Sequence, residues 1–247
     1  MKEKHPLLEV CCGSMTSVDN ALAGGAGRIE LCSALGVGGL TPSLGLLREA
    51  RKRYPALTIH VLIRPREGDF NYSPGEMEVL MEDVRLAVEN GADGIVCGIL
   101  DKNGEIDIVR TGQVIAASGG RQFTFHRAFD AVTDPISSLE TLVSLGCHRV
   151  LTSGGAETAV EGADMLKKLV RAADGRIIVM PGAGVKSSNV AHLMRNTGCT
   201  EVHASCARAL APAMRGPALG VADDGSRTET DANEVAAVIA ALREFRI

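Results

Sequence analysis

The sequence predicts an α/β fold of the TIM (β/α)8 barrel type, with residues 1–247 forming one domain. Short segments rich in β-forming residues alternate with longer amphipathic segments eight times along the chain, which predicts a parallel sheet. A length of 247 residues is close to that of one such barrel, and 45% hydrophobic residues suit a large core. Because no linker interrupts the eight units, we expect the sheet to close into a barrel.

In the first half of the chain, four strands each precede a helix. We expect strands at 7–11, 28–32, 58–64 and 94–98, with helices at 17–24, 43–53, 74–90 and 107–118. Glycines follow the first and third helices, at Gly24-Gly25-Ala26-Gly27 and at Asn90-Gly91-Ala92-Asp93. Glycine takes the left-handed conformation that ends helices, so these positions mark the helix ends.

The second half repeats the pattern, with strands at 122–126, 149–152, 176–181 and 201–205 and helices at 135–145, 158–173, 187–196 and 231–245. Gly146 and Gly198 end the fifth and seventh helices in the same way. One long irregular segment, 207–230, follows the eighth strand and is expected at the C-terminal mouth of the barrel. Loops of this length are either functional lids or passive insertions, and both interpretations remain open.

Polar side chains share one face of several expected strands. Residues two apart on a strand point the same way, so the alternation separates apolar residues facing the helices from polar residues facing the barrel interior. The interior set is Glu9, Glu30, His60, Arg64, His126 and His203, with Cys11 and Cys32 near the top. Buried charges cost free energy that a purely structural barrel avoids, which indicates a functional site. The alternative is a core network in which Glu9, Glu30 and Arg64 neutralise one another.

The segment Phe123-Thr-Phe-His126-Arg127-Ala-Phe129-Asp130 is the sharpest functional signal. Its β-forming run ends in three ionisable side chains, His126, Arg127 and Asp130, each costly to bury without a partner. A charged loop after a strand would look the same locally. Because the arrangement recurs at other strand ends, we expect these residues and His203 to belong to one catalytic constellation.

Two glycine-rich turns follow the sixth and seventh strands. They are Ser153-Gly154-Gly155 and Gly182-Ala183-Gly184. In these barrels such loops commonly bind phosphate through exposed backbone N–H groups and a helix N-terminus. We therefore predict an anion site at Ser153, Gly154, Gly155, Gly182 and Gly184.

Composition excludes several classes of partner. A net charge of -4 without a Lys/Arg run argues against nucleic acid and anionic membranes, and 3% aromatic residues without Trp argue against base stacking. No apolar run approaches the roughly 20 residues of a membrane span, and residues 1–6 lack a signal-peptide core. Seven cysteines without CxxC spacing disfavour disulfides and zinc ribbons. These features predict a cytoplasmic protein with reduced thiols.

The chain resembles the CutC copper-homeostasis family over almost its entire length. The matching segments are Leu8-Glu-Val-Cys11, Arg28-Ile-Glu-Leu-Cys-Ser33, Gly38-Gly-Leu-Thr-Pro-Ser43, Ile63-Arg-Pro-Arg66 with Gly68-Asp-Phe70, Thr124-Phe-His-Arg-Ala-Phe-Asp130, Arg149-Val-Leu-Thr-Ser-Gly154, Met180-Pro-Gly-Ala-Gly184 and Val202-His-Ala-Ser205. The resemblance implies a TIM barrel, a cytoplasmic location and a homo-oligomer, often a dimer.

The resemblance also implies a Cu(I) site, with the family's two cysteines at Cys11 and Cys32. Thiolates are the ligands that a soft cation prefers, and neighbouring strands lie about 4.8 Å apart, which suits two same-facing thiols. The chain departs from the family pattern at Cys12-Gly13 and at Cys206. Both changes alter the rim of the site and leave the two thiols in place.

The sequence therefore leaves two active functions open, and an inactive barrel is the third alternative. The first is a protein that binds copper(I) through Cys11 and Cys32. The second is an isomerase or lyase acting on a small phosphorylated or carboxylated metabolite, with Glu9, Glu30 or His126 as general acid or base and Arg64 or Arg127 holding the anion. No strand carries an evident Schiff-base lysine, which argues against an imine-forming aldolase. The third is an inactive barrel that serves as a partner scaffold.

Overall fold

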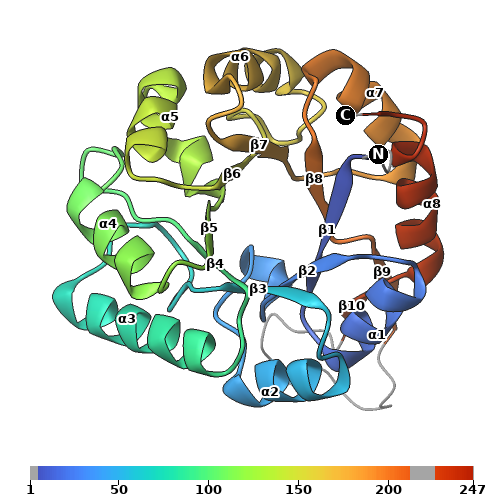
Figure 1. Ribbon diagram of the computed structural model, residues 1–247, viewed down its shortest axis with the longest axis horizontal. Helices are drawn as coiled ribbons and strands as arrows, with labels where there is room; N and C mark the ends of the chain where they lie inside the picture. The colour runs from blue at the N-terminus through green and yellow to red at the C-terminus, as the bar shows by residue number, and fades with distance from the viewer. Residues whose placement is uncertain (1–4, 212–225, 247) are drawn as a thin grey trace.

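Eight strands form one parallel sheet with the order β7-β6-β5-β4-β3-β2-β1-β8. The computed structural model describes residues 5–211 and 226–246. The strands are β1 (Leu7–Cys12), β2 (Arg28–Leu31), β3 (Thr58–Leu62), β4 (Gly94–Cys97), β5 (Gln122–Phe125), β6 (Arg149–Thr152), β7 (Ile178–Pro181) and β8 (Glu201–Ala204). The end strands β7 and β8 lie side by side (Figure 1), so the sheet curls into a nearly closed barrel and the predicted fold class is confirmed.

A ring of helices covers the outside of the barrel (Figure 1). The helices are α1 (Met15–Ala23), α2 (Leu44–Arg53), α3 (Pro74–Glu89), α4 (Ile108–Ala117), α5 (Pro135–Ser144), α6 (Ala163–Ala173), α7 (Ser187–Thr197) and α8 (Ala232–Leu242). Most begin at a short polar residue whose side chain accepts a hydrogen bond from the first turn, such as Ser73 in the capping box with Glu76. These caps fix where each helix leaves its loop.

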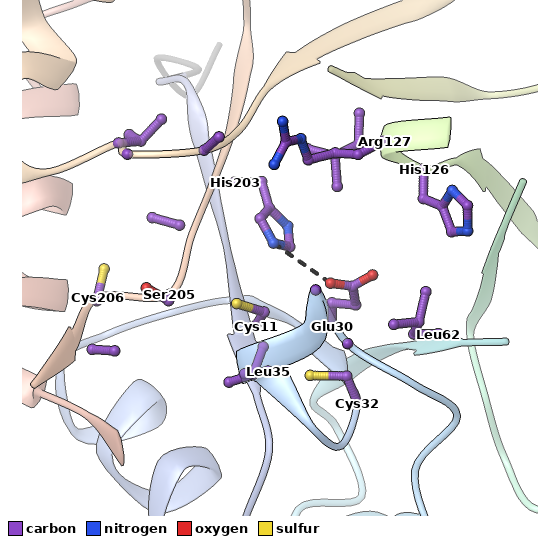
Figure 2. Close-up of a pocket in the computed structure, with 18 of the residues that line it drawn as sticks. Cys11, Glu30, Cys32, Leu35, Leu62, His126, Arg127, His203, Ser205 and Cys206 are labelled. Atoms are coloured by element: carbon purple, nitrogen blue, oxygen red, sulfur yellow. Dashed lines mark ion pairs between the residues drawn. The ribbon is translucent and has the colours of Figure 1, made fainter. Parts of the chain in front are cut away.

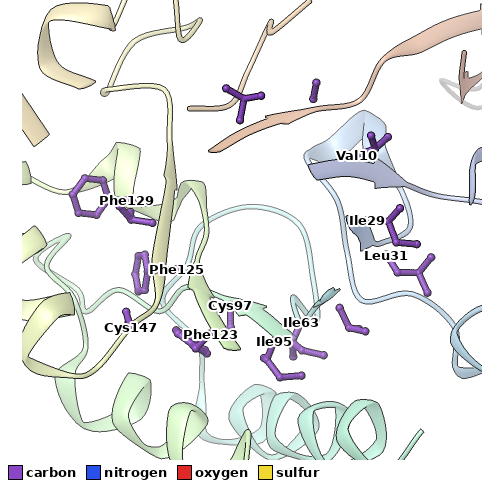
Figure 3. Close-up of a cluster of buried hydrophobic side chains, with 14 of the residues drawn as sticks. Val10, Ile29, Leu31, Ile63, Ile95, Cys97, Phe123, Phe125, Phe129 and Cys147 are labelled. Atoms are coloured by element: carbon purple, nitrogen blue, oxygen red, sulfur yellow. The ribbon is translucent and has the colours of Figure 1, made fainter. Parts of the chain in front are cut away.

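The hydrophobic core lies between the sheet and the helices. Apolar residues of the strands alternate outward, as with Ile29 and Leu31 on β2, and both are fully buried. Figure 3 shows them in one cluster with Ile95, Phe123 and Phe125. The expected division of the strands into an apolar outer face and a polar inner face is therefore present.

The barrel interior is filled with charged and polar side chains in place of the branched apolar residues common in such barrels. The inward set is completely or almost completely buried and comprises Glu9, Arg28, Glu30, His60, Thr124, Arg149, Glu201 and His203. A second, small apolar cluster of Cys11, Cys32, Leu62 and Val96 lies at the upper end of this interior. The candidate functional site lies on these two layers.

The segment after β8 differs from the expected irregular loop. Its ends, β9 (Ala207–Leu210) and β10 (Arg227–Thr230), pair as an antiparallel ribbon, and residues 212–225 of the expected lid lie outside the described part of the chain. The ribbon pairs two segments far apart in the sequence, neither of which has a strong strand pattern.

Smaller differences concern boundaries. The sixth helix, expected from 158, begins at Ala163 because residues 156–162 form turns, and β7 begins at Ile178. Two short 3-10 helices, Leu35–Val37 and Arg127–Ala131, occupy the loops after β2 and β5. In the described ranges, the helices are too short or too polar to cross a bilayer.

Candidate functional site

A pocket of about 880 Å³ opens at the C-terminal ends of the strands, which is the size and position of small-molecule sites in these barrels. Figure 2 shows thiol, carboxyl, imidazole and guanidinium groups meeting there. The predicted site residues that line it are Cys11, Glu30, Cys32, Arg64, His126, Arg127, Gly184 and His203. Glu9, Asp130, Ser153, Gly154, Gly155 and Gly182 are not among its lining residues.

Glu9 lies beneath the pocket in a buried ionic network. Its Oε2 atom lies 2.7 Å from Arg28 Nε and 3.0 Å from His60 Nδ1. Arg28 also pairs with Glu201, and Glu201 binds Arg149 through an N–O contact of 2.9 Å. Burial opposes ionisation of Glu9, but hydrogen bonds with His203 and His60 and the charge of Arg28 hold its pKa well below the usual value. Glu9 is therefore a fixed anion that supports the site from below.

His203 connects this network to the pocket. Its Nδ1 lies 3.0 Å from Glu9 Oε1, and its Nε2 lies 3.5 Å from Glu30 Oε2 (dashed line in Figure 2). Burial lowers the pKa of His203, but the hydrogen bond with Cys11, the charge of Glu30 and the hydrogen bond with Glu9 raise it well above its usual value. The side chain is accordingly an imidazolium held between two carboxyl groups.

Glu30 is a buried carboxyl group that lines the pocket. Burial raises its pKa, the charge of His203 opposes the rise and the charge of Glu9 adds to it, so that the pKa is about 7. A carboxyl group with this pKa gives up and takes up a proton near neutral pH, as general acid–base chemistry requires.

The raised pKa of Glu30 predicts a pH-dependent stability. A group whose folded pKa is raised stabilises the protein fully below its unfolded value of 4.5, and this contribution is lost as pH rises through about 7. Relative to Glu30→Gln, the parent should lose roughly 2–4 kcal/mol of unfolding free energy between these pH values. Urea unfolding of both proteins across this range measures the difference, and two parallel curves would contradict the assignment.

Arg64 and His126 form a second polar corner of the pocket. In the described part of the chain, neither side chain forms an ion pair with a carboxylate. Arg64 donates to the carbonyl oxygens of Val37 and Gly39 and to that of Gly68, at 2.8–3.0 Å. Its guanidinium carbon lies 5.1 Å from the ring centre of Phe70, and the His126 ring lies 5.0 Å from the same ring. Burial and the Arg64 charge lower the pKa of His126 to about 3, so the imidazole is neutral.

Arg127 and Asp130 form an ion pair, and Asp130 also binds the loop after β6. Arg127 Nε lies 2.8 Å from Asp130 Oδ2, and Asp130 accepts hydrogen bonds from the backbone N–H groups of Ser153 and Gly155. The N–H of Gly154 donates to Thr152 Oγ1. Asp130 thus takes the place that the sequence assigned to a bound anion at Ser153-Gly154-Gly155, and an anion there would have to displace it.

The second predicted anion loop is also partly used by the protein. The N–H of Gly182 donates to the Thr152 carbonyl oxygen, and Glu234 accepts from the backbone N–H and hydroxyl of Ser187 at the start of α7. A carboxylate at a helix N-terminus is stabilised by the helix dipole. Anion binding at Gly182 and Gly184 stays a prediction, with Gly184 as its pocket-facing residue.

Cys11 and Cys32 both face the upper interior and pack in one cluster with Leu62 and Val96. In the register of β1 and β2, Cys11 lies opposite Glu30. Cys32 therefore lies two residues beyond the position directly opposite Cys11. Burial raises the pKa of the Cys32 thiol well above its usual value, and the charge of Cys11 adds to this. Among the described residues, no group of three His, Cys, Asp or Glu side chains is arranged to hold a metal ion.

Sequence reasoning missed the lower half of the charge network. Arg28, Arg149 and Glu201 are all buried and join Glu9 from below. The available signal was the alternation of side chains along a strand. Arg28 is two residues before Glu30, and Glu201 is two residues before His203, so each shares the inward face of its neighbour. Glu234 of α8 also lines the pocket and could not be placed there without the fold.

Fold and site together define a TIM barrel whose C-terminal mouth holds a pocket with carboxyl, imidazole, thiol and guanidinium groups. A CutC family model matches residues 6–208. The chain is 45% identical to a CutC family protein of Chromobacterium violaceum, covering 96% of this chain and 98% of that protein. It is 49% identical to the mouse copper homeostasis protein cutC homolog, covering 81% and 73% respectively. The chain belongs to the CutC family.

Solved structures agree with this assignment. A CutC protein of Streptococcus agalactiae superposes with a TM-score of 0.78 at 35% identity, covering 81% of this chain and 98% of that one. A thiamine phosphate pyrophosphorylase of Pyrococcus furiosus superposes with a TM-score of 0.60 at 16% identity, covering 98% and 97%. The second similarity shows the shared barrel fold alone.

Proposed function

We propose that this protein binds Cu(I) through Cys11 and Cys32 and acts in copper homeostasis in the cytoplasm. The observation that carries the proposal is that both thiols line one pocket and pack in the same small cluster. The mouse and human relatives bear the name copper homeostasis protein cutC homolog.

The chemistry of the donors fits a soft cation. Two thiolates suit Cu(I), and the apolar side chains of Leu35 and Leu62 beside them limit access of water. Burial disfavours the free Cys32 thiolate, so metal binding must displace protons and should weaken as pH falls. His203 contacts the Cys11 sulfur and compensates part of the negative charge of the bound thiolates.

The expected result is loss of Cu(I) affinity in the Cys11→Ser/Cys32→Ser double variant, by at least about a hundredfold, because serine offers no soft ligand. Competition titration with a Cu(I) chelator under reducing conditions measures the affinity. Cys97→Ser/Cys147→Ser is the matched control, since these buried thiols lie in the outer core. Equal affinity in the two double variants would remove the proposed site.

A second candidate function is acid–base catalysis on a small anionic metabolite, as an isomerase or lyase. The observation favouring it is that Glu30, His203 and His126 line the same pocket as the cations Arg64 and Arg127. Proton transfer by a positioned carboxyl or imidazole beside an anion-binding cation is a recurrent catalytic arrangement. Native mass spectrometry of the purified protein separates the candidates: bound metal supports the first, and a bound organic anion the second.

The oligomeric state belongs to the same proposal. From the family resemblance we propose a homodimer, and the native mass of the protein measured in the same experiment tests it.

A further inference from the structure

The corner of the pocket around Phe70 contains buried polar atoms without partners. Arg64 Nε and His126 Nε2 make no hydrogen bond in the described structure. Their residues line the pocket and are only 6% and 5% exposed. Buried donors left unpaired cost about 1–3 kcal/mol each, so a cluster of them calls for an acceptor that the chain does not supply.

The free donors of Arg64 follow from counting its bonds. Nη1 donates to the carbonyl oxygens of Val37 and Gly39, and Nη2 donates once, to Gly68. Apart from a contact with the Tyr72 hydroxyl, this leaves the Nε hydrogen and one Nη2 hydrogen. Nε and Nη2 are the donor pair with which a guanidinium grips a planar carboxylate side-on.

The Arg64 charge also lacks a counterion. No ion pair joins Arg64 to a carboxylate in the described ranges, whereas the equally buried Arg28 and Arg149 both pair with Glu201. The carbonyl contacts and the Phe70 ring solvate this charge only in part. A buried cation without an anion is expensive, which favours an anionic ligand.

His126 adds a donor of fixed orientation. Its Nδ1 accepts from the Ala128 N–H at 3.1 Å, so the neutral ring carries its proton on Nε2. An uncharged donor beside Arg64 binds an oxyanion without repelling the guanidinium.

We propose that Arg64 and His126 form a carboxylate-binding subsite of the pocket, with Phe70 as its apolar wall. The ligand class is a small organic acid whose carboxylate supplies the missing counterion of Arg64. The inference deepens the second candidate function, because it names the chemical group by which that metabolite is held, and it does not depend on copper.

The experiment is an NMR titration of arginine Nε–H signals in the metal-free full-length protein, with sodium acetate as the probe and sodium chloride at equal ionic strength. The Arg64 signal should shift and saturate with acetate. Arg64→Lys removes this signal, so its acetate binding is followed through the His126 ring signals. The variant keeps the charge but loses the paired Nε and Nη2 donors, and should bind at least about tenfold more weakly. Lys186→Gln, which removes another cation of the same pocket, should bind as the parent does.

Further arms make each outcome decisive. His126→Phe should also weaken binding, and it provides a test if Arg64 variants do not fold. Inorganic phosphate distinguishes the ligand's anionic group, because tighter phosphate than acetate binding would overturn the carboxylate assignment. A shift that does not saturate, or equal binding by Arg64→Lys, would show that water satisfies these donors and would refute the subsite. An organic anion co-purifying despite that result would leave the second candidate function standing.

Discussion

Replacing Arg28 with methionine should destabilise the folded protein by about 3–5 kcal/mol, the usual effect of removing one partner from a buried ion pair. Arg28 is 4% exposed and binds both Glu9 and Glu201. Methionine fills similar space but leaves two carboxylates short of a partner. Urea unfolding at neutral pH, where both carboxylates are ionised, measures the loss.

Two comparisons show whether unpaired charge is the cause. Arg28→Met/Glu201→Gln should recover part of the lost stability, because one orphaned carboxylate becomes neutral. Arg53→Met, which breaks the exposed pair with Asp19 (side chains 43% and 40% exposed), should change stability little. An Arg28→Met variant as stable as the parent would mean that the network contributes nothing to folding.

Replacing Gly162 with alanine should cost about 2–3 kcal/mol, the upper part of the range for overpacked positions. A Cβ atom at Gly162 would lie 1.8 Å from the carbonyl oxygen of Ser153 and 3.1 Å from Gly154 Cα. Backbone atoms cannot rotate away as a side chain would, so the loop carrying Ser153 must move. Thermal or urea unfolding reports the loss of stability.

Gly75→Ala is the control for this substitution. An added Cβ there meets no atom within 4 Å, and the residue lies in the first turn of α3. Alanine in a helix is favoured over glycine by up to about 1 kcal/mol, so the control should change stability in the opposite direction or not at all. Similar losses in both variants would show that the Gly162 contact is not the cause.

The strands and the inward phase of Glu9, Glu30 and His203 could be predicted because alternation along a strand is a local property. The role of Arg28 could not. At the first position of a strand, an arginine looks like a solvent-exposed end. Only closure of the barrel brings Glu201 against it from the other side.

The predicted anion loops show where prediction from a local motif fails. Small residues at Ser153-Gly154-Gly155 do present backbone donors, as predicted, but Asp130 from the preceding loop accepts two of them. Glu234, distant in sequence, does the same at Ser187. Whether a donor is available depends on competition from distant carboxylates, and a local motif carries no information about that competition. The β9–β10 ribbon was missed for a related reason, since its pairing is non-local.

The β9–β10 ribbon after β8 also offers a place to insert another protein domain. Leu210 opposes Arg227, so the chain leaves and re-enters the ribbon at neighbouring positions, and Thr230 is tied to α1 by hydrogen bonds with Ser17 and Asn20. An insertion between two such anchored ends adds little strain to the host fold. Because Arg208 of β9 lines the pocket, a circularly permuted fluorescent protein replacing 212–225 would sit beside the mouth. The barrel would thereby become a genetically encodable sensor for whatever molecule fills it.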